Sequence, residues 1–163
     1  MSKLLFVCTG NTCRSSMAAA IASDIASKRG LNIEIASAGL AAIDGLPATP
    51  QAIKALDKMN IDLSGHQSRS LTENMINEAD LILTMTVGHR DSILNKYPSS
   101  KDKTFTLKEY VKEAEPHDGQ QPEKAQLDIP DPFGQPLELY QNIAEELTGL
   151  INQVFDKYLE TKN

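Results

Sequence analysis

Short apolar runs alternate with helix-like segments along this chain, and this alternation constrains the fold more than any other feature of the sequence. The runs have strand length, and the segments between them repeat apolar residues at helical spacing. Such alternation is typical of a parallel sheet with helices on both faces. We therefore predict a three-layer α/β/α fold with a four-stranded parallel twisted sheet, in one domain spanning residues 1–163. The predicted strands are Lys3–Val7, Asn32–Ser37, Asp80–Thr86 (as the central strand) and Thr104–Leu107.

Five segments are predicted to be helices from their apolar spacing and their terminal residues. Thr49 is a suitable N-cap with Pro50 at the first helical position, and Gly30 is a stop signal. The stretch between Glu113 and Pro136 is polar and rich in Pro, Gly and Gln, so we expect a long irregular loop of the kind that is often functional. The predicted helices are Ser15–Arg29, Thr49–Met59, Thr72–Ala79, Val87–Tyr97 and Leu137–Leu159.

The composition excludes several classes of protein. A formal net charge of -6 argues against a broad grip on nucleic acid. No apolar run approaches the roughly 20 residues that cross a bilayer, and the first residues lack the features of a signal peptide, so we expect a cytoplasmic protein without a membrane partner. Two cysteines are too few for a disulfide scaffold or a structural zinc site. The three histidines, His66, His89 and His117, show no ligand spacing, so we interpret them as structural or surface residues and expect no metal. We also expect no cofactor.

Both cysteines lie in one stretch, VCTGNTCRS, between the first predicted strand and the first predicted helix. Ligands of open α/β sheets bind beyond the carboxyl ends of the strands, and N–H groups at a helix N-terminus attract anions. Gly10 and Asn11 tolerate the left-handed backbone that curls a loop around an anion, and Arg14 can clamp two phosphate oxygens. We therefore predict a phosphate-binding loop that consists of Thr9, Gly10, Asn11, Thr12, Cys13, Arg14 and Ser15.

Cys8 begins this loop, and five residues separate it from Arg14. A thiol that faces N–H donors and an arginine is favoured as the thiolate, which is the nucleophilic form. The pattern therefore indicates phosphoryl transfer through a phosphocysteine. The alternative is a buried cysteine in an ordinary strand-to-helix turn, since cysteine is among the most buried residue types. The Gly, Asn, Arg and Ser residues that follow Cys8 favour the catalytic interpretation.

The stretch VCTGNTCRS also resembles the active-site loop of the low-molecular-weight protein tyrosine phosphatases, and the resemblance covers nearly the whole chain. Further motifs appear in the order of that family: SAG at 37–39, HQSRSL at 66–71, ADLILTMT at 79–86 and DPFG at 131–134. The resemblance implies that Cys8 is the nucleophile, Arg14 the phosphate clamp and Asp131 the general acid. It also implies that Ser15 donates a hydrogen bond to the thiolate and that Asn11 holds the shape of the loop.

An acid is also required by the chemistry, because the leaving group must be protonated as its bond to phosphorus breaks. Asp131 lies in a Pro-flanked segment that restricts the backbone. From spacing alone, an ordinary turn aspartate is the favoured interpretation. Asp128 is a competing candidate nearby, but only Asp131 is followed by PFG.

The resemblance further implies that His66 and Arg69 support the loop from beneath. The alternative is a solvated polar turn.

Cys13 has two compatible interpretations. It can pack under the loop, or it can form a reversible disulfide with Cys8 that protects the nucleophile from irreversible oxidation. Two aromatic residues, Tyr110 and Phe133, are candidates for walls of the substrate entrance, with a place in the core as the alternative.

Thr12 bears on the choice of substrate. Tyrosine-specific members of the family usually carry isoleucine at the matching position, whereas threonine resembles the bacterial branch that removes phosphate from arginine. A hydroxyl makes the pocket wall more polar and suits a guanidinium that needs hydrogen-bond partners. We therefore expect protein phosphoarginine as the substrate, with phosphotyrosine as the alternative.

Two further activities are disfavoured. An arsenate reductase needs additional thiols downstream, and the chain has none after Cys13. A phosphocysteine carrier would retain its phosphate, which Arg14 and Asp131 argue against. We expect phosphorylated proteins as substrates, inorganic phosphate as product and a monomer.

Overall fold

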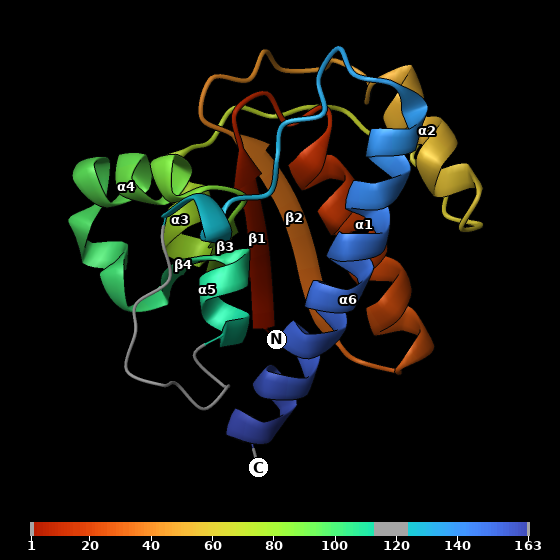
Figure 1. The fold of residues 1–163 in the computed structure, drawn as a ribbon. Coiled ribbons are helices and arrows are strands. Elements are labelled where there is room, and N and C mark those ends of the chain that lie inside the picture. Colours follow the sequence, from red (N-terminus) through yellow and green to blue (C-terminus); the bar gives the residue numbers. More distant parts are fainter. Residues whose placement is uncertain (1, 113–123, 163) are drawn as a thin grey trace.

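Four parallel strands form one sheet in the computed structural model, which describes residues 2–112 and 124–162. Their order is β2-β1-β3-β4 (Figure 1), and it confirms the predicted four-stranded parallel sheet. β1 and β3 both occupy inner positions, so the strand predicted to be central shares the centre with β1. The strands are β1 (Ser2–Cys8), β2 (Ile33–Gly39), β3 (Leu81–Thr84) and β4 (Thr104–Thr106).

Alternate residues of β1 face opposite sides of the sheet, as the period of a strand requires. Leu4 and Phe6 belong to a large apolar cluster that includes residues of helices α1, α2, α5 and α6. Leu5 and Val7 belong to a second cluster with residues of α3 and α4. The sheet is therefore covered by helices on both faces, and the three-layer architecture is confirmed (Figure 1).

All five predicted helices are present, with ends shifted by a few residues at most. Thr49 caps α2 by accepting from Ala52 N–H, and Thr72 and Thr86 cap α3 and α4 in the same way. Three short elements were not predicted: the helix α5 and two 3₁₀ turns at Pro98–Lys103 and Lys124–Leu127. The helices are α1 (Arg14–Lys28), α2 (Pro50–Asp57), α3 (Glu73–Glu78), α4 (Val87–Lys96), α5 (Leu107–Lys112) and α6 (Leu137–Lys162).

The carboxyl ends of the strands meet at one edge of the sheet. Cys8 is paired with Gly39 at the end of β1 and β2, and Val7 is paired with Thr84 at the end of β3. The β1–α1 loop, the chain after β2 and the segment leading into α6 all lie at this edge, at the top of Figure 1. This is the place where ligands bind in open parallel sheets.

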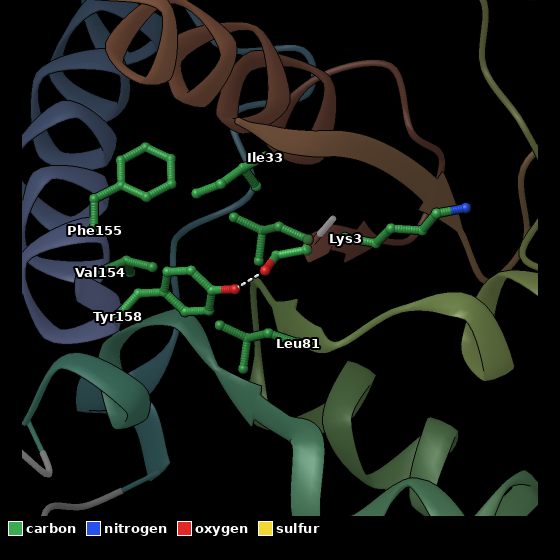
Figure 2. A pocket seen from close by; sticks show the side chains of 8 residues that line it. Lys3, Ile33, Leu81, Val154, Phe155 and Tyr158 are labelled. Atoms are coloured by element: carbon green, nitrogen blue, oxygen red, sulfur yellow. Dashed lines mark hydrogen bonds between the residues drawn. The ribbon is translucent and has the colours of Figure 1, made fainter. Parts of the chain in front are cut away.

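A small apolar cavity lies at the opposite edge, beside the start of β1 (Figure 2). Val154, Phe155 and Tyr158 of α6 face Ile33 and Leu81 across it, and the Tyr158 hydroxyl hydrogen-bonds to the Ser2 hydroxyl. In the described part of the chain, no helix has the length and apolar character needed to cross a membrane.

Candidate active site

The loop after β1 folds around the sulfur of Cys8. The Ser15 hydroxyl lies 2.8 Å from Cys8 Sγ, and the Asn11 backbone N–H points at the same sulfur from 3.3 Å. Asn11 adopts a φ of 58°, which is the left-handed conformation predicted for this position. The loop therefore turns back on itself and brings the Ser15 hydroxyl and the Asn11 N–H to the thiol.

Asn11 is fully buried and holds the loop through each of its polar groups. Its side-chain N–H groups donate to the hydroxyls of Ser15 and Ser37, at 2.9 Å each. Its side-chain oxygen accepts from the backbone N–H of Arg69 at 2.9 Å, and its carbonyl accepts from His66 Nε2 at 2.6 Å. These contacts join the loop to the HQSRSL motif, and Arg69 contributes its backbone amide to them.

Position 39 must be glycine because the backbone of the phosphate-binding loop lies very close to it. This role was not predicted from the sequence. A Cβ atom built on Gly39 would lie 2.5 Å from the Thr9 carbonyl oxygen and 3.0 Å from the Asn11 backbone nitrogen. Both neighbours are backbone atoms of the loop, so they cannot move aside as a flexible side chain could. The SAG motif was the available signal, because a glycine that ends a strand often marks such an approach.

Helix α1 begins directly at the loop. Its N-cap residue is Cys13, and among the described residues no side chain caps the first turn. The N–H groups of this turn therefore stay available to an anion, and the helix dipole adds positive potential there.

Arg14 connects the loop to the segment that carries Asp131. Its side chain is only 6% exposed, and Nη1 donates to the Ile129 carbonyl at 3.0 Å. Nη2 lies 3.8 Å from Asp131 Oδ2. Asp131 itself is 60% exposed, and its Oδ1 accepts from the Phe133 backbone N–H at 3.0 Å. A buried guanidinium and an accessible carboxylate thus lie together at the loop.

Asp128, the competing acid candidate, has a different environment. Its Oδ1 accepts from the Val87 backbone N–H at 2.8 Å, so it satisfies a donor at the start of α4. The next residue, Ile129, donates from its backbone N–H to the Met85 carbonyl at 2.8 Å. Asp128 therefore anchors the segment to α4, while Asp131 faces Arg14.

Thr12 is a half-buried residue of the loop. Its backbone carbonyl accepts from Thr49 N–H at 3.0 Å, which ties the loop to the N-cap of α2. Its Oγ1 lies 3.7 Å from the position where Gly10 would carry a Cβ. Any side chain at position 10 would therefore contact the Thr12 hydroxyl.

Cys13 is buried, and both cysteines are free thiols. Its Sγ lies 3.5 Å from Tyr140 Oη and 3.6 Å from Thr49 Oγ1. Burial raises the pKa of Tyr140 to about 12, so the phenol stays protonated and can donate. Tyr140 could not be recognised from the sequence as a partner of Cys13, because an aromatic residue at helical spacing is usually core.

The two aromatic candidates for the entrance differ. Phe133 is 70% exposed and follows Asp131 by two residues, at the outer side of the site. Tyr110 takes the alternative place in the core: it is buried, its ring lies 5.6 Å from that of Phe105, and the Lys157 ammonium lies 4.0 Å above it. Tyr110 is thus one of the residues by which α5 packs on the core.

His89 is a buried residue of the site that the sequence analysis treated as structural or surface. Its Nε2 lies 2.8 Å from Thr9 Oγ1. Burial, and then the nearby Arg14, lower the pKa of His89 to about 4, so the ring is neutral at neutral pH. His117 lies outside the described residues. No group of three or more metal-ligating side chains occurs in residues 2–112 and 124–162.

Comparisons with known proteins agree with this geometry. A family model described as low molecular weight phosphotyrosine protein phosphatase matches residues 3–163. A protein-arginine-phosphatase of Bacillus subtilis (strain 168) is 41% identical over 151 residues, which cover 93% of each chain.

Solved structures of phosphatases are also similar to this chain over nearly its whole length. One, described as a YwlE arginine phosphatase mutant with a phosphorylated active-site serine, has a TM-score of 0.84 and 40% identity, with 95% of this chain and 94% of that chain covered. A low molecular weight protein tyrosine phosphatase from T. tengcongensis has a TM-score of 0.85 and 42% identity, with 96% and 99% covered. The names of the similar proteins thus include both arginine phosphatase and tyrosine phosphatase.

Proposed function

The chain belongs to the low-molecular-weight phosphotyrosine protein phosphatase family, and from this premise we propose that it is a cysteine-dependent protein phosphatase that acts on phosphoarginine. One observation carries the proposal: the Cys8 sulfur is enclosed by Asn11 and Ser15, and the neighbouring Arg14 lies 3.8 Å from Asp131. This arrangement supports Cys8 as the nucleophile, Arg14 as the phosphate clamp and Asp131 as the acid.

In the first step, the Cys8 thiolate attacks phosphorus and forms an S–P bond. The loop N–H groups and Arg14 bind the three phosphoryl oxygens and stabilise the charge that develops on them. The bond from phosphorus to the leaving nitrogen or oxygen breaks, and its electron pair stays on the leaving group. Asp131 protonates that atom. Its exposed side chain is accessible to the leaving group.

In the second step, a water molecule attacks the phosphocysteine. Asp131, now a carboxylate, accepts a proton from the water as the new O–P bond forms. The S–P bond breaks and returns the thiolate, which the Ser15 hydroxyl at 2.8 Å stabilises by donating a hydrogen bond. Inorganic phosphate is released. The relative with a phosphorylated active-site serine supports a phosphoenzyme at the matching position.

Phosphoarginine is the preferred substrate class because of Thr12. A guanidinium brings several N–H donors to the pocket, and a hydroxyl on the wall can accept from one of them. The Asp131 carboxyl can also accept a hydrogen bond from this guanidinium while it carries the proton that it gives to the leaving nitrogen. The similar Bacillus subtilis protein is named a protein-arginine-phosphatase, which supports this choice. We further expect the enzyme to act as a monomer in the bacterial cytoplasm.

The variant Thr12→Ile tests the substrate class. Each guanidinium donor that is left unpaired against an apolar wall costs roughly 1–3 kcal/mol, whereas an aryl ring gains from an apolar neighbour. The ratio of kcat/KM for phosphoarginine to that for phosphotyrosine should therefore fall by about tenfold to a hundredfold. Thr12→Ser retains the hydroxyl and should retain the ratio. An unchanged ratio in Thr12→Ile would favour the phosphotyrosine alternative.

We also propose that Cys13 protects Cys8 by forming a reversible disulfide. The two thiols belong to one loop, and both are free. Mild peroxide should inactivate the enzyme, a thiol reductant should restore it, and mass spectrometry should find the two cysteine peptides cross-linked. In Cys13→Ser the same treatment should become irreversible. Sulfonic acid on Cys8 of the wild type without any cross-link would reject the proposal.

A further inference from the structure

His89 lies in the first turn of α4, and its side chain reaches the residue that follows the nucleophile. The ring is buried, and Nε2 lies 2.8 Å from the hydroxyl of Thr9. The backbone of Thr9 is held from the other side, because its carbonyl accepts from Ala41 N–H at 3.0 Å. The start of the loop is therefore fixed between α4 and the chain after β2.

Within the described part of the chain, the His89 ring forms its hydrogen bond with the Thr9 hydroxyl. The other ring nitrogen, Nδ1, is buried and has no hydrogen-bond partner there. Burying a polar ring with one nitrogen unsatisfied is unfavourable, and an apolar side chain would fill the same space without that cost. The hydrogen bond to Thr9 is thus the feature that distinguishes His89 from a packing residue.

The charges around His89 explain why an imidazole suits this position. Burial and the charge of Arg14 lower the pKa of His89, whereas the carboxylates of Asp128 and Asp131 raise it. The lowering effects are the larger. The ring therefore stays uncharged. A lysine or arginine here would place a second cation beside Arg14, whereas a neutral ring bonds Thr9 and leaves Arg14 as the cation of the site.

The same turn of α4 also holds the segment that carries the acid. The Val87 backbone N–H binds the Asp128 carboxylate at 2.8 Å, two residues before His89 in the same turn. The Met85 carbonyl, just before α4, accepts from the Ile129 backbone N–H at 2.8 Å. One short stretch, residues 85–89, thus contacts both the phosphate loop and the acid segment.

We propose that His89 is a positioning residue, which holds Thr9 and thereby sets the phosphate loop relative to the acid segment. The inference rests on the proposed phosphatase function. His89 acts through the Thr9 hydroxyl, so it makes no bond to the substrate and transfers no proton. Its contribution belongs to the transition state, in which nucleophile and acid must act together.

A double-mutant cycle tests this mechanism with an aryl phosphate as substrate. Thr9→Val and His89→Leu each remove one partner of the hydrogen bond and keep a side chain of similar size. Each should lower kcat by about tenfold, and the double variant should be no slower than the slower single variant. His89→Gln places an amide within reach of the Thr9 hydroxyl and should recover most of the activity.

Two further readouts separate positioning from a general loss of structure. Inhibition by inorganic phosphate should weaken by less than about threefold in each single variant, because ground-state binding rests on the loop N–H groups and Arg14. The Tm of Thr9→Val should match that of the wild type. If His89→Leu fails to fold, Thr9→Val and His89→Gln still decide the question.

Three results would overturn the inference. These are losses that multiply in the double variant, a wild-type kcat in Thr9→Val, or a His89→Gln enzyme as slow as His89→Leu. In each of these the wild type still hydrolyses the aryl phosphate, so the proposed phosphatase activity stands. A wild type without activity on any phosphoryl substrate would contradict the proposed function itself.

Discussion

Replacing Cys8 by serine should reduce kcat/KM by at least about 10⁴-fold, because a hydroxyl at this position is a far weaker nucleophile than a thiolate. The loop should remain intact, since Ser15 and Asn11 can hydrogen-bond to an oxygen as they do to the sulfur. Affinity for inorganic phosphate, measured by calorimetry, should therefore change little. After long incubation with substrate, mass spectrometry should find a phosphoryl group retained on the new serine.

Cys13→Ser is the matched control for this experiment. Cys13 belongs to the same loop, but its thiol contacts Tyr140 and Thr49. We therefore expect a loss that is smaller by orders of magnitude than that of Cys8→Ser. Full activity in Cys8→Ser would exclude a phosphocysteine.

Replacing Asp131 by asparagine should lower the rate by roughly 10²–10⁴-fold on phosphoarginine, because the amide cannot protonate the leaving nitrogen. An activated aryl phosphate carries a good leaving group that needs little protonation, so its loss should be much smaller. The measurement is kcat/KM on both substrates, with the pH dependence of each.

Asp128→Asn is the control for the acid. An asparagine oxygen can still accept the hydrogen bond from Val87 N–H that Asp128 accepts at 2.8 Å. The acid segment should therefore stay anchored, and the loss should be slight for both substrates. Equal losses for both substrates in Asp131→Asn would indicate a structural role, and a greater effect at Asp128 would move the assignment there.

The layers of the fold could be predicted because strand length and helical spacing are local properties of the sequence. The four strands and the predicted helices required only apolar periodicity, Thr49 as a cap and Gly30 as a stop. Helix α3, which also has six residues, was predicted together with its cap Thr72. The predicted strand Thr104–Leu107 extended into the first residue of α5, and the short helix α5 was missed. Its place depends on packing against α6, which no local window contains.

The site could be predicted where its residues share one loop, and only in part where they converge from distant elements. Cys8 and Arg14 are neighbours in the sequence, so their spacing revealed a pattern. The bond from His89 to Thr9 spans 80 positions, and that from Arg14 to the Ile129 carbonyl spans 115. A backbone carbonyl has no signature in the sequence, and a single histidine has no pattern until the fold brings it to the loop.

The central claim, that this family member removes phosphate from arginine, is tested most directly with the wild-type enzyme. Two peptides of matched sequence, one with phosphoarginine and one with phosphotyrosine at the same position, should be assayed in one buffer for the release of inorganic phosphate. We predict a kcat/KM for the phosphoarginine peptide that exceeds the other by at least about tenfold, which corresponds to about 1.4 kcal/mol of transition-state discrimination. A higher kcat/KM for the phosphotyrosine peptide would contradict the account.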